Sequence, residues 1–337
     1  MTVSPNEASW GSVYDSRQAQ YEELRDEVEF ALRRALHGLK THNIIVRLKE
    51  RNSFIEKIGR KKYSDPFKQM PDIVGARVVC RFLDDIQVVD AALRETFAIR
   101  SFEDKTASAA PETFAYRSVH YECTIRDEHR GPHYDGIKNL TFEVQVRTIL
   151  QDAWAVVEHA LAYKGPQSIP PELKRDFSAL VGLFHVADKQ FQQLKEGVAE
   201  SERKATLAVE SQSTSGDHDK VDDLPLDRGV LKAALTRLFP GRDRSEDWDY
   251  STLVEELGAV GIHTLVNLLD AIDIDPEIMS ELKERELADG PYPDEDGNPS
   301  DRFTDAGFIR HVLDSQHPTF WDSRRSRYEN FTDDDFF

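Results

Sequence analysis

Three polar side chains with complementary chemistry alternate with apolar ones between Leu140 and Thr148. Glu143, Gln145 and Arg147 offer a carboxylate, an amide and a guanidinium. Alternation with a period of two indicates a β-strand, so the three side chains lie on one face of it. Burying such polar groups in a hydrophobic core costs free energy, but a site that binds phosphate and a metal ion needs them. The spacing alone also fits a solvent-facing strand equally well.

Further polar residues occur in the segments that precede this strand. Asp72 begins the apolar run DIVGARVVCRFL, and His120 lies within YRSVHYECTIR. Carboxylates on separate strands together with cations suit phosphoryl transfer, because Mg²⁺ takes oxygen ligands and Lys or Arg neutralises a triphosphate. The sequence contains neither GxxxxGK[ST] nor GxGxxG, which excludes a P-loop and a dinucleotide-binding fingerprint. The pooled candidates are Arg47, Lys49, Ser53, Lys57, Asp72, Arg77, Lys105, Tyr116, Arg117, His120, Glu143 and Gln145.

The elements that position these groups follow from the hydrophobic pattern. Residues 17–42 carry apolar side chains at helical spacing, which predicts a long amphipathic helix that packs on a core. A short strand from Ile44 to Leu48 follows. The segment from Ser53 then begins a second helix, on which Ser53 and Lys57 lie four residues apart and therefore on one face.

The run from Asp72 to Leu83 is dense in β-branched residues and predicts a central strand. Gly75 inside it indicates a close approach of the backbone. The polar loop after residue 102 is long enough to be a binding loop. It leads into a strand that places Val119, Tyr121, Cys123 and Ile125 on one face and Ser118, His120, Glu122 and Thr124 on the other.

Two helices are predicted after the strand that holds Glu143. Thr148 is a plausible N-cap for the first, whose apolar positions are Ile149, Ala153, Val157, Ala160 and Leu161. The second begins at prolines after Lys164, and its apolar stripe is Leu173, Phe177, Leu180, Phe184, Ala187, Phe191 and Leu194. The predicted fold class is α/β (α+β).

Charge divides the 337-residue chain into two parts. Residues 1–216 hold 30 Lys and Arg against 32 Asp and Glu, whereas residues 217–337 hold 13 against 30 and carry most of the net charge of -19. A polar tract of low apolar content separates the parts. We therefore predict one domain over residues 17–210, a linker over 211–225, and an acidic, mostly helical domain over 226–337.

The composition also bears on compartment and redox chemistry. No run of about 18 apolar residues occurs and the N-terminus lacks a secretory pattern, so we expect a soluble, cytoplasmic protein without a membrane partner. Cys80 and Cys123 each lie in an apolar, strand-like run. Buried free thiols are therefore expected, rather than a disulfide or a metal pair.

Taken in order, the motifs resemble the RelA/SpoT-type alarmone synthetase domain. They are RLKERNSFIEKI, DIVGARVVCRFLDDI, YRSVHY, and FEVQVRT followed by QDAWAVVEHALAYK, and the resemblance covers roughly residues 21–204. It implies a nucleotidyltransferase-like synthetase domain, with a mixed β-sheet flanked by helices, and a GTP/GDP pyrophosphokinase. Such an enzyme transfers pyrophosphate from ATP to the 3'-hydroxyl of GDP or GTP, using Mg²⁺, to make (p)ppGpp.

The resemblance also implies a role for each candidate residue. Arg47 and Arg77 would sandwich the adenine of ATP, while Lys49, Ser53 and Lys57 would hold its phosphates. Asp72 and Glu143 would bind Mg²⁺, and Glu143 would also take the proton of the attacking hydroxyl. The acceptor-binding set implied in this way is Lys105, Tyr116, Arg117, His120 and Gln145, of which His120 and Gln145 are also assigned catalytic roles.

Two departures from the family pattern affect the expected activity. Only about 45 residues precede Arg47, so no hydrolase module is expected before the synthetase and no hydrolase activity is expected. Small synthetases usually carry Pro-Lys and Gly shortly before the acceptor tyrosine, whereas this chain has Pro111-Glu112-Thr113-Phe114-Ala115-Tyr116. This loop sets the acceptor pocket, so the acceptor stays open.

Two alternatives to a small alarmone synthetase therefore stay open. One is a toxin-type enzyme that transfers pyrophosphate to the tRNA 3' end and inhibits translation. The other is an inactive nucleotide-binding regulatory module. The acidic C-terminal domain suggests a further hypothesis, since a tethered acidic segment can dock on the basic run from Arg47 to Lys68 and restrain the synthetase. The oligomeric state, including a homo-oligomer, is also left open.

Overall fold

The computed structural model describes residues 5–104, 118–161, 170–211, 224–272, 292–293, 299–300 and 303–329. The chain forms two compact units, Met1–Lys195 and Glu196–Phe337. The first unit contains a β-sheet and the second is mostly helical, as the sequence predicts. The division falls inside one continuous helix, α7 (Lys174–Ser211). Most of the predicted linker, 211–225, lies outside the described residues, so that boundary stays a prediction.

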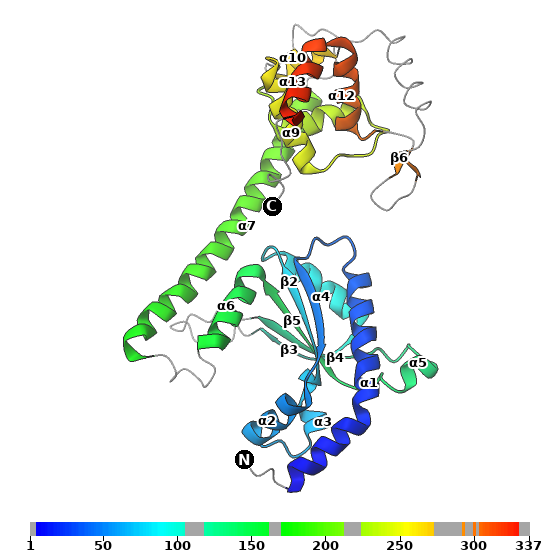
Figure 1. The fold of residues 1–337 in the computed structure, drawn as a ribbon, viewed down its shortest axis with the longest axis vertical. Coiled ribbons are helices and arrows are strands. Elements are labelled where there is room, and N and C mark those ends of the chain that lie inside the picture. The colour runs from blue at the N-terminus through cyan, green and yellow to red at the C-terminus, as the bar shows by residue number, and fades with distance from the viewer. Residues whose placement is uncertain are drawn as a thin grey trace. The chain divides into compact units, whose positions relative to one another are not determined.

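The sheet of the first unit has five strands in the order β1-β2-β5-β4-β3 (Figure 1). β2 and β5 run parallel, and the other neighbouring pairs are antiparallel. The predicted mixed sheet is therefore confirmed. Its strands are β1 (Asn43–Leu48), β2 (Val74–Cys80), β3 (Ala98–Asp104), β4 (Val119–Thr124) and β5 (Phe142–Thr148).

One face of this sheet is apolar and is covered by α1 (Pro5–Ala35) and α4 (Asp85–Thr96). The alternation along β5 buries Phe142, Val144 and Val146 on this face, where they join one core with residues of α1 and α4. The helix α1 begins at Pro5, earlier than the predicted residue 17. Its added turns are held by aromatic contacts, because the Tyr14 ring centroid lies 4.9 Å from that of Phe54.

The opposite face carries the polar side chains and is approached by α6 (Ile149–Leu161). A capping box starts this helix. The Gln151 backbone N–H donates to Thr148 Oγ1 at 3.1 Å, and the Thr148 N–H donates to Gln151 Oε1 at 3.0 Å. The Thr148 hydroxyl also donates to Asp188 Oδ2 of α7 at 2.7 Å, which connects strand, cap and following helix. The two hydrogen bonds between Thr148 and Gln151 confirm the predicted capping role of Thr148.

The predicted apolar stripes of α6 and α7 are only partly buried in the single chain. Trp154 of α6 is 3% exposed and packs on Phe177 and Phe184 of α7. In contrast, Val157 is 44% exposed and Leu194 is 64% exposed. The helical period is correct, but periodicity does not identify what covers an apolar face. Other apolar residues of these helices with large exposure are Ile149, Val156, Leu161, Leu173, Leu180, Leu183, Val186, Phe191 and Val198.

Short elements complete the first unit. They lie between the strands and before α7, and α2 carries Ser53 and Lys57 one turn apart as expected. Their bounds are α2 (Arg51–Lys61), α3 (Pro66–Gln69), α5 (Pro132–Asp135), and 3₁₀ turns at Pro71–Ile73 and Pro171–Leu173.

The second unit has its own hydrophobic core, which includes the fully buried Leu231, Leu253 and Phe308. The Asp305 carboxylate is fully buried within this unit and accepts from the Tyr250 hydroxyl at 2.7 Å. The predicted helix over residues 276–287 lies outside the described residues. The described elements are α8 (Arg228–Leu238), α9 (Asp247–Ala259), α10 (Leu265–Ala271), β6 (Tyr292–Pro293), β7 (Pro299–Ser300), α12 (Asp305–Gln316) and α13 (Pro318–Glu329).

Two further expectations from composition can be compared with the structure. Cys80 and Cys123 are free and buried, and burial raises the pKa of each thiol to about 12. The prediction of buried free thiols is therefore confirmed. Within the described residues, no helix is both long enough and apolar enough to span a membrane.

Candidate active site

Strand register brings the predicted site residues together on the polar face of the sheet. Glu143 of β5 is opposite Gly75 of β2, which is in turn opposite Arg47 of β1. Two residues further along β5, Gln145 is flanked by Arg77 of β2 and His120 of β4. Side chains in register point to the same face of the sheet, so these residues form two neighbouring rows across it although they are distant in the sequence.

A small cavity of about 90 Å³ opens between these rows. A Cβ atom built on Gly75 would meet no atom within 4 Å, so the strand backbone borders open space at this point. This is the arrangement that lets a ligand approach a strand closely. The cavity is lined by Ile45, Arg47, Asp72, Gly75, Ala76, Arg77, Glu143 and Gln145.

Glu143 lies at the centre of a hydrogen-bond network. Its Oε1 accepts from His120 Nδ1 at 2.7 Å, and its Oε2 accepts from Gln145 Nε2 at 2.8 Å. Ser118 Oγ lies 2.6 Å from His120 Nε2, so a neutral imidazole that donates to Glu143 accepts the serine proton. These contacts fix the plane of the carboxylate and the orientation of the ring.

The partners of Glu143 also determine its charge. Burial raises the pKa of this carboxyl, but the hydrogen bond and charge of His120 and the hydrogen bond from Gln145 outweigh burial. The pKa of Glu143 therefore lies below its ordinary value of 4.5. The negative charge of Asp72 acts in the opposite direction, which indicates that the two carboxylates interact.

The network continues from Gln145 to the helix α6. Arg147 Nη2 donates to Gln145 Oε1 at 2.8 Å, and Arg147 Nη1 lies 3.4 Å from Asp152 Oδ1. The same oxygen of Asp152 forms an ion pair with Arg77 Nη1 at 3.0 Å. Burial and the charge of Arg77 lower the pKa of Arg147 from its ordinary value. Asp152 therefore holds two neighbouring guanidinium groups in place.

Asp72 is the second carboxylate of the cavity and is paired with two lysines. Its Oδ2 lies 2.7 Å from Lys57 Nζ and 3.0 Å from Lys49 Nζ. Burial raises the pKa of Asp72, but the hydrogen bonds and charges of these lysines outweigh it, so the pKa lies below 3.8. The cluster of one carboxylate and two ammonium groups has a net positive charge, which favours a bound phosphate.

The donor set fits a magnesium ion. Asp72 Oδ1 is buried and has no hydrogen-bond partner among the described residues, so an oxygen ligand is left open in the cavity wall. Glu143 supplies a second carboxylate to the same cavity. Mg²⁺ is commonly held by one or two carboxylates together with substrate phosphates and water. Within the described residues, no group of three or more His, Cys, Asp and Glu could hold a metal by itself.

Arg47 and Arg77 are placed as diagonal neighbours on β1 and β2. Arg47 is in register with Gly75, and Arg77 is in register with the exposed Ile45. Diagonal neighbours in an antiparallel pair lie about 7–8 Å apart, a separation that leaves room for one planar ring. Ser53 is exposed in the first turn of α2, and no contact joins it to the cavity. Lys105, Tyr116 and Arg117 lie outside the described residues.

Three members of the network were not among the candidate residues. The strand period had placed Ser118 on one face with His120 and Arg147 on one face with Gln145, but neither residue was included among the candidates. Asp152 lies on α6, and its pairing with Arg77 depends on how this helix packs. No signal local in the sequence pairs these two residues.

Comparison with known proteins agrees with the motifs. Residues 46–168 match the family described as the region found in RelA/SpoT proteins. The GTP pyrophosphokinase YwaC of Bacillus subtilis (strain 168) is 29% identical over 173 residues, which are 48% of this chain and 78% of YwaC. The GTP pyrophosphokinase YjbM of the same organism is 33% identical over 136 residues, 38% of this chain and 59% of YjbM, less than two thirds of its length.

A solved structure is also similar. It is the small alarmone synthetase 1 of Bacillus subtilis bound to its product pppGpp, at 26% identity and a TM-score of 0.46. The match covers 57% of this chain and 99% of that one. The resemblance to the RelA/SpoT synthetases is thus confirmed by the family match and the two curated relatives.

Proposed function

We propose that this chain, which carries the region found in RelA/SpoT proteins over residues 46–168, is a pyrophosphokinase. It transfers the β,γ-pyrophosphate of ATP to the 3'-hydroxyl of GDP or GTP. The observation that carries the proposal is that every polar residue lining the small cavity falls within the matched region. The two curated relatives, both GTP pyrophosphokinases, support the reaction and the acceptor.

The donor half of the proposed site lies over β1, β2 and α2. Arg47 and Arg77 flank the adenine, because guanidinium planes stack on aromatic rings. The positive cluster of Lys49 and Lys57 lies at Asp72 and neutralises the phosphates, with Ser53 one turn before Lys57 on α2. Asp152 holds Arg77 through its ion pair and keeps the guanidinium on this face of the sheet.

The acceptor half lies over β4 and β5. In the transfer, the acceptor O3' forms a bond to the β-phosphorus of ATP, the bond from that phosphorus to the α-phosphate oxygen breaks, and AMP leaves. Glu143 takes the proton of the 3'-hydroxyl, since its ionised carboxylate is held in one orientation by His120 and Gln145. Lys105, Tyr116, Arg117, His120 and Gln145 are proposed to bind the acceptor.

Asp72 and Glu143 are also proposed to hold Mg²⁺. The ion would neutralise charge on the pyrophosphate during transfer. Asp72 Oδ1 is the open ligand that supports this assignment. The protein residues would then position the donor, the acceptor and the ion around the open space beside Gly75.

A transfer assay tests the proposal. The purified full chain is incubated with γ-³²P-ATP and Mg²⁺ and is offered GDP, GTP, ADP or bulk tRNA in separate reactions. We expect labelled ppGpp from GDP and labelled pppGpp from GTP. Label on tRNA alone would replace the acceptor assignment with a toxin-type activity, and no labelled product with any acceptor would reject the enzyme. Unlabelled pppGpp added alone should stay intact, because synthesis without hydrolysis is proposed.

A further inference from the structure

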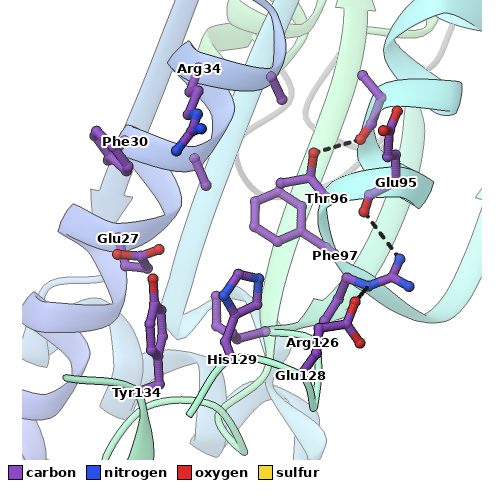
Figure 2. Close-up of a pocket in the computed structure, with 14 residues that line it drawn as sticks. Glu27, Phe30, Arg34, Glu95, Thr96, Phe97, Arg126, Glu128, His129 and Tyr134 are labelled. Carbon is purple, nitrogen blue, oxygen red and sulfur yellow. Dashed lines mark hydrogen bonds and ion pairs between the residues drawn. The ribbon is translucent and has the colours of Figure 1, made fainter. Parts of the chain in front are cut away.

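A larger cavity of about 430 Å³ lies away from the polar face, against α1, the end of α4 and the segment that follows β4 (Figure 2). The helices α1 and α4 cover the apolar face of the sheet, so this cavity and the candidate active site are on opposite faces. Its volume is within the range of small-molecule sites. The transfer mechanism uses none of its lining residues.

The two walls of this cavity are held by polar contacts. On the α1 side, Glu27 Oε2 lies 2.8 Å from His133 Nε2. Figure 2 shows the Tyr134 hydroxyl directed toward the same carboxylate, and burial together with the charge and hydrogen bond of Glu27 raises the pKa of Tyr134. On the α4 side, Arg126 Nη1 donates to the backbone carbonyls of Arg94 at 3.0 Å and Glu95 at 3.1 Å. These contacts preform the cavity, which reduces the cost of ordering it around a ligand.

The floor of the cavity is apolar and aromatic. Phe97 is 2% exposed and Ile125 is 3% exposed, so only their edges face the opening. The His129 and Tyr134 rings pack together with centroids 4.9 Å apart and an interplanar angle of 44°. Phe30 of α1, which also lines the cavity, is 61% exposed. Several ring faces and edges therefore surround one space, which suits a flat, largely apolar ligand.

Charge in the lining restricts the ligand further. Glu27 is paired with His133, and Glu128 is paired with Arg126 at 2.6 Å. In contrast, the Arg34 guanidinium forms no hydrogen bond or ion pair with another described residue, and it borders the same opening as Phe97 and His129 (Figure 2). Three carboxylates line the cavity, Glu27, Glu95 and Glu128, which disfavours a nucleoside polyphosphate. Neither Arg34 nor the Glu95 carboxylate is paired in this way with another described residue, and Figure 2 shows the two on opposite sides of the opening, so the Arg34 side suits a single negative charge.

We propose that this cavity binds a small aromatic carboxylate. The ring system would lie on Phe97 and against the His129–Tyr134 pair, and the carboxylate would accept from Arg34. A guanidinium binds a carboxylate through two parallel hydrogen bonds, so Arg34 would set both charge preference and orientation.

The test uses 2-naphthoate as probe, with the uncharged 2-naphthamide for comparison, in calorimetric titrations of the full chain. We expect one 2-naphthoate per chain, bound about fivefold to tenfold more tightly than the amide, as for a partly exposed charge pair. Arg34→Gln should remove this difference. Arg33→Gln is the matched control, because Arg33 pairs with Glu29 at 2.7 Å and does not line the cavity.

Two further measurements separate this cavity from other places where the probe could bind. Ala31→Phe places a ring in the cavity and should abolish binding in protein whose circular dichroism and melting temperature show that it is folded. Arg47→Gln, on the opposite face of the sheet, should leave binding unchanged. The proposal is overturned if wild-type protein does not bind 2-naphthoate, if Arg34→Gln leaves the preference over the amide intact, or if Arg47→Gln alone weakens binding.

Discussion

Asp72 and Glu143 are both carboxylates of one cavity, but their partners differ. Glu143 accepts from an imidazole and an amide, which orient it, whereas Asp72 is paired with two lysines through one oxygen and has the other open. Orientation suits a group that takes a proton, and an open oxygen suits a group that binds a metal ion. The same side-chain type is thereby adapted to two roles by its surroundings.

The first prediction concerns two substitutions that remove these charges at nearly constant side-chain volume. Asp72→Asn and Glu143→Gln should each lower kcat for pyrophosphate transfer by at least ~100-fold, the scale expected for a lost general base or electrostatic group. Asp127→Asn, an exposed carboxylate in the turn after β4, is the control and should keep wild-type turnover. Near-normal turnover in either active-site variant would refute the metal and base assignments.

The second prediction concerns acid stability. The pKa of Asp72 in the folded protein lies below the ordinary 3.8, so the unfolded chain takes up this proton first as pH falls. The stabilisation from Asp72 is therefore complete above about pH 4 and is lost as pH falls through the lowered folded pKa. Urea denaturation from pH 7 to pH 3 should show a smaller loss of unfolding free energy in Asp72→Asn than in wild type. An identical pH dependence in the two proteins would contradict the pairing with Lys49 and Lys57.

At the scale of elements, the junction between β5 and α6 connects the polar face to the rest of the unit. The capping box fixes where the helix starts, and the Thr148 hydroxyl joins this start to Asp188 on α7. Asp152 follows one turn into the helix and pairs with Arg77 and Arg147. The position of two guanidinium groups therefore depends on a helix cap that contacts no substrate.

The third prediction tests this dependence. Thr148→Val keeps the side-chain shape but removes the cap acceptor and the bond to Asp188, so the unfolding free energy should fall by about 1–3 kcal/mol. Transfer activity should also fall, since Asp152 loses its fixed position. Thr206→Val removes a single hydroxyl bond to the helix carbonyl of Glu202 on α7 and should change stability by less than ~0.5 kcal/mol. Chemical denaturation measures the unfolding free energy of both variants, and steady-state kinetics measures their transfer activity. Equal unfolding free energies in the two variants would exclude the proposed role of the cap.

At the scale of the whole molecule, the two units have separate hydrophobic cores. The main core of the first unit combines the sheet with α1 and α4, and the core of the second combines α8, α9, α10 and α12 with the end of α7. A unit with its own core can fold by itself. Residues 217–337 carry most of the net negative charge, so removing the second unit changes the net charge strongly.

The fourth prediction therefore concerns a chain truncated after Glu210. It should fold, melt cooperatively and retain pyrophosphate transfer, because the candidate active site lies within the first unit. If the acidic unit restrains the synthetase, the truncated protein should be more active than the full chain, and the difference should shrink above about 0.15 M salt. Equal activity at every salt concentration, from a folded fragment, would reject the hypothesis of restraint. A fragment that is unfolded would show that the units depend on each other.

The sequence by itself determined four of the five strands and the faces of the sheet, whereas β3 (Ala98–Asp104) was not predicted. The period of two along residues 140–148 separated buried Phe142, Val144 and Val146 from polar Glu143 and Gln145, and the structure has the same division. The long N-terminal helix, the capping role of Thr148 and the buried thiols were also predictable. Such features depend on local spacing, on side-chain shape and on hydropathy, which can be read directly along the chain.

Only the tertiary structure decided which polar groups meet. The pairing of Asp72 with Lys49 depends on how the end of β1 lies beside the turn before β2, and its pairing with Lys57 depends on where α2 places this lysine. The pairing of Asp152 with Arg77 depends on how α6 lies on the polar face. The exposure of Val157 and Leu194 was not predictable either, because helical periodicity defines an apolar stripe without specifying what covers it. Register and helix packing join residues that are distant in sequence, and these contacts arise from the shape of the whole unit rather than from local spacing.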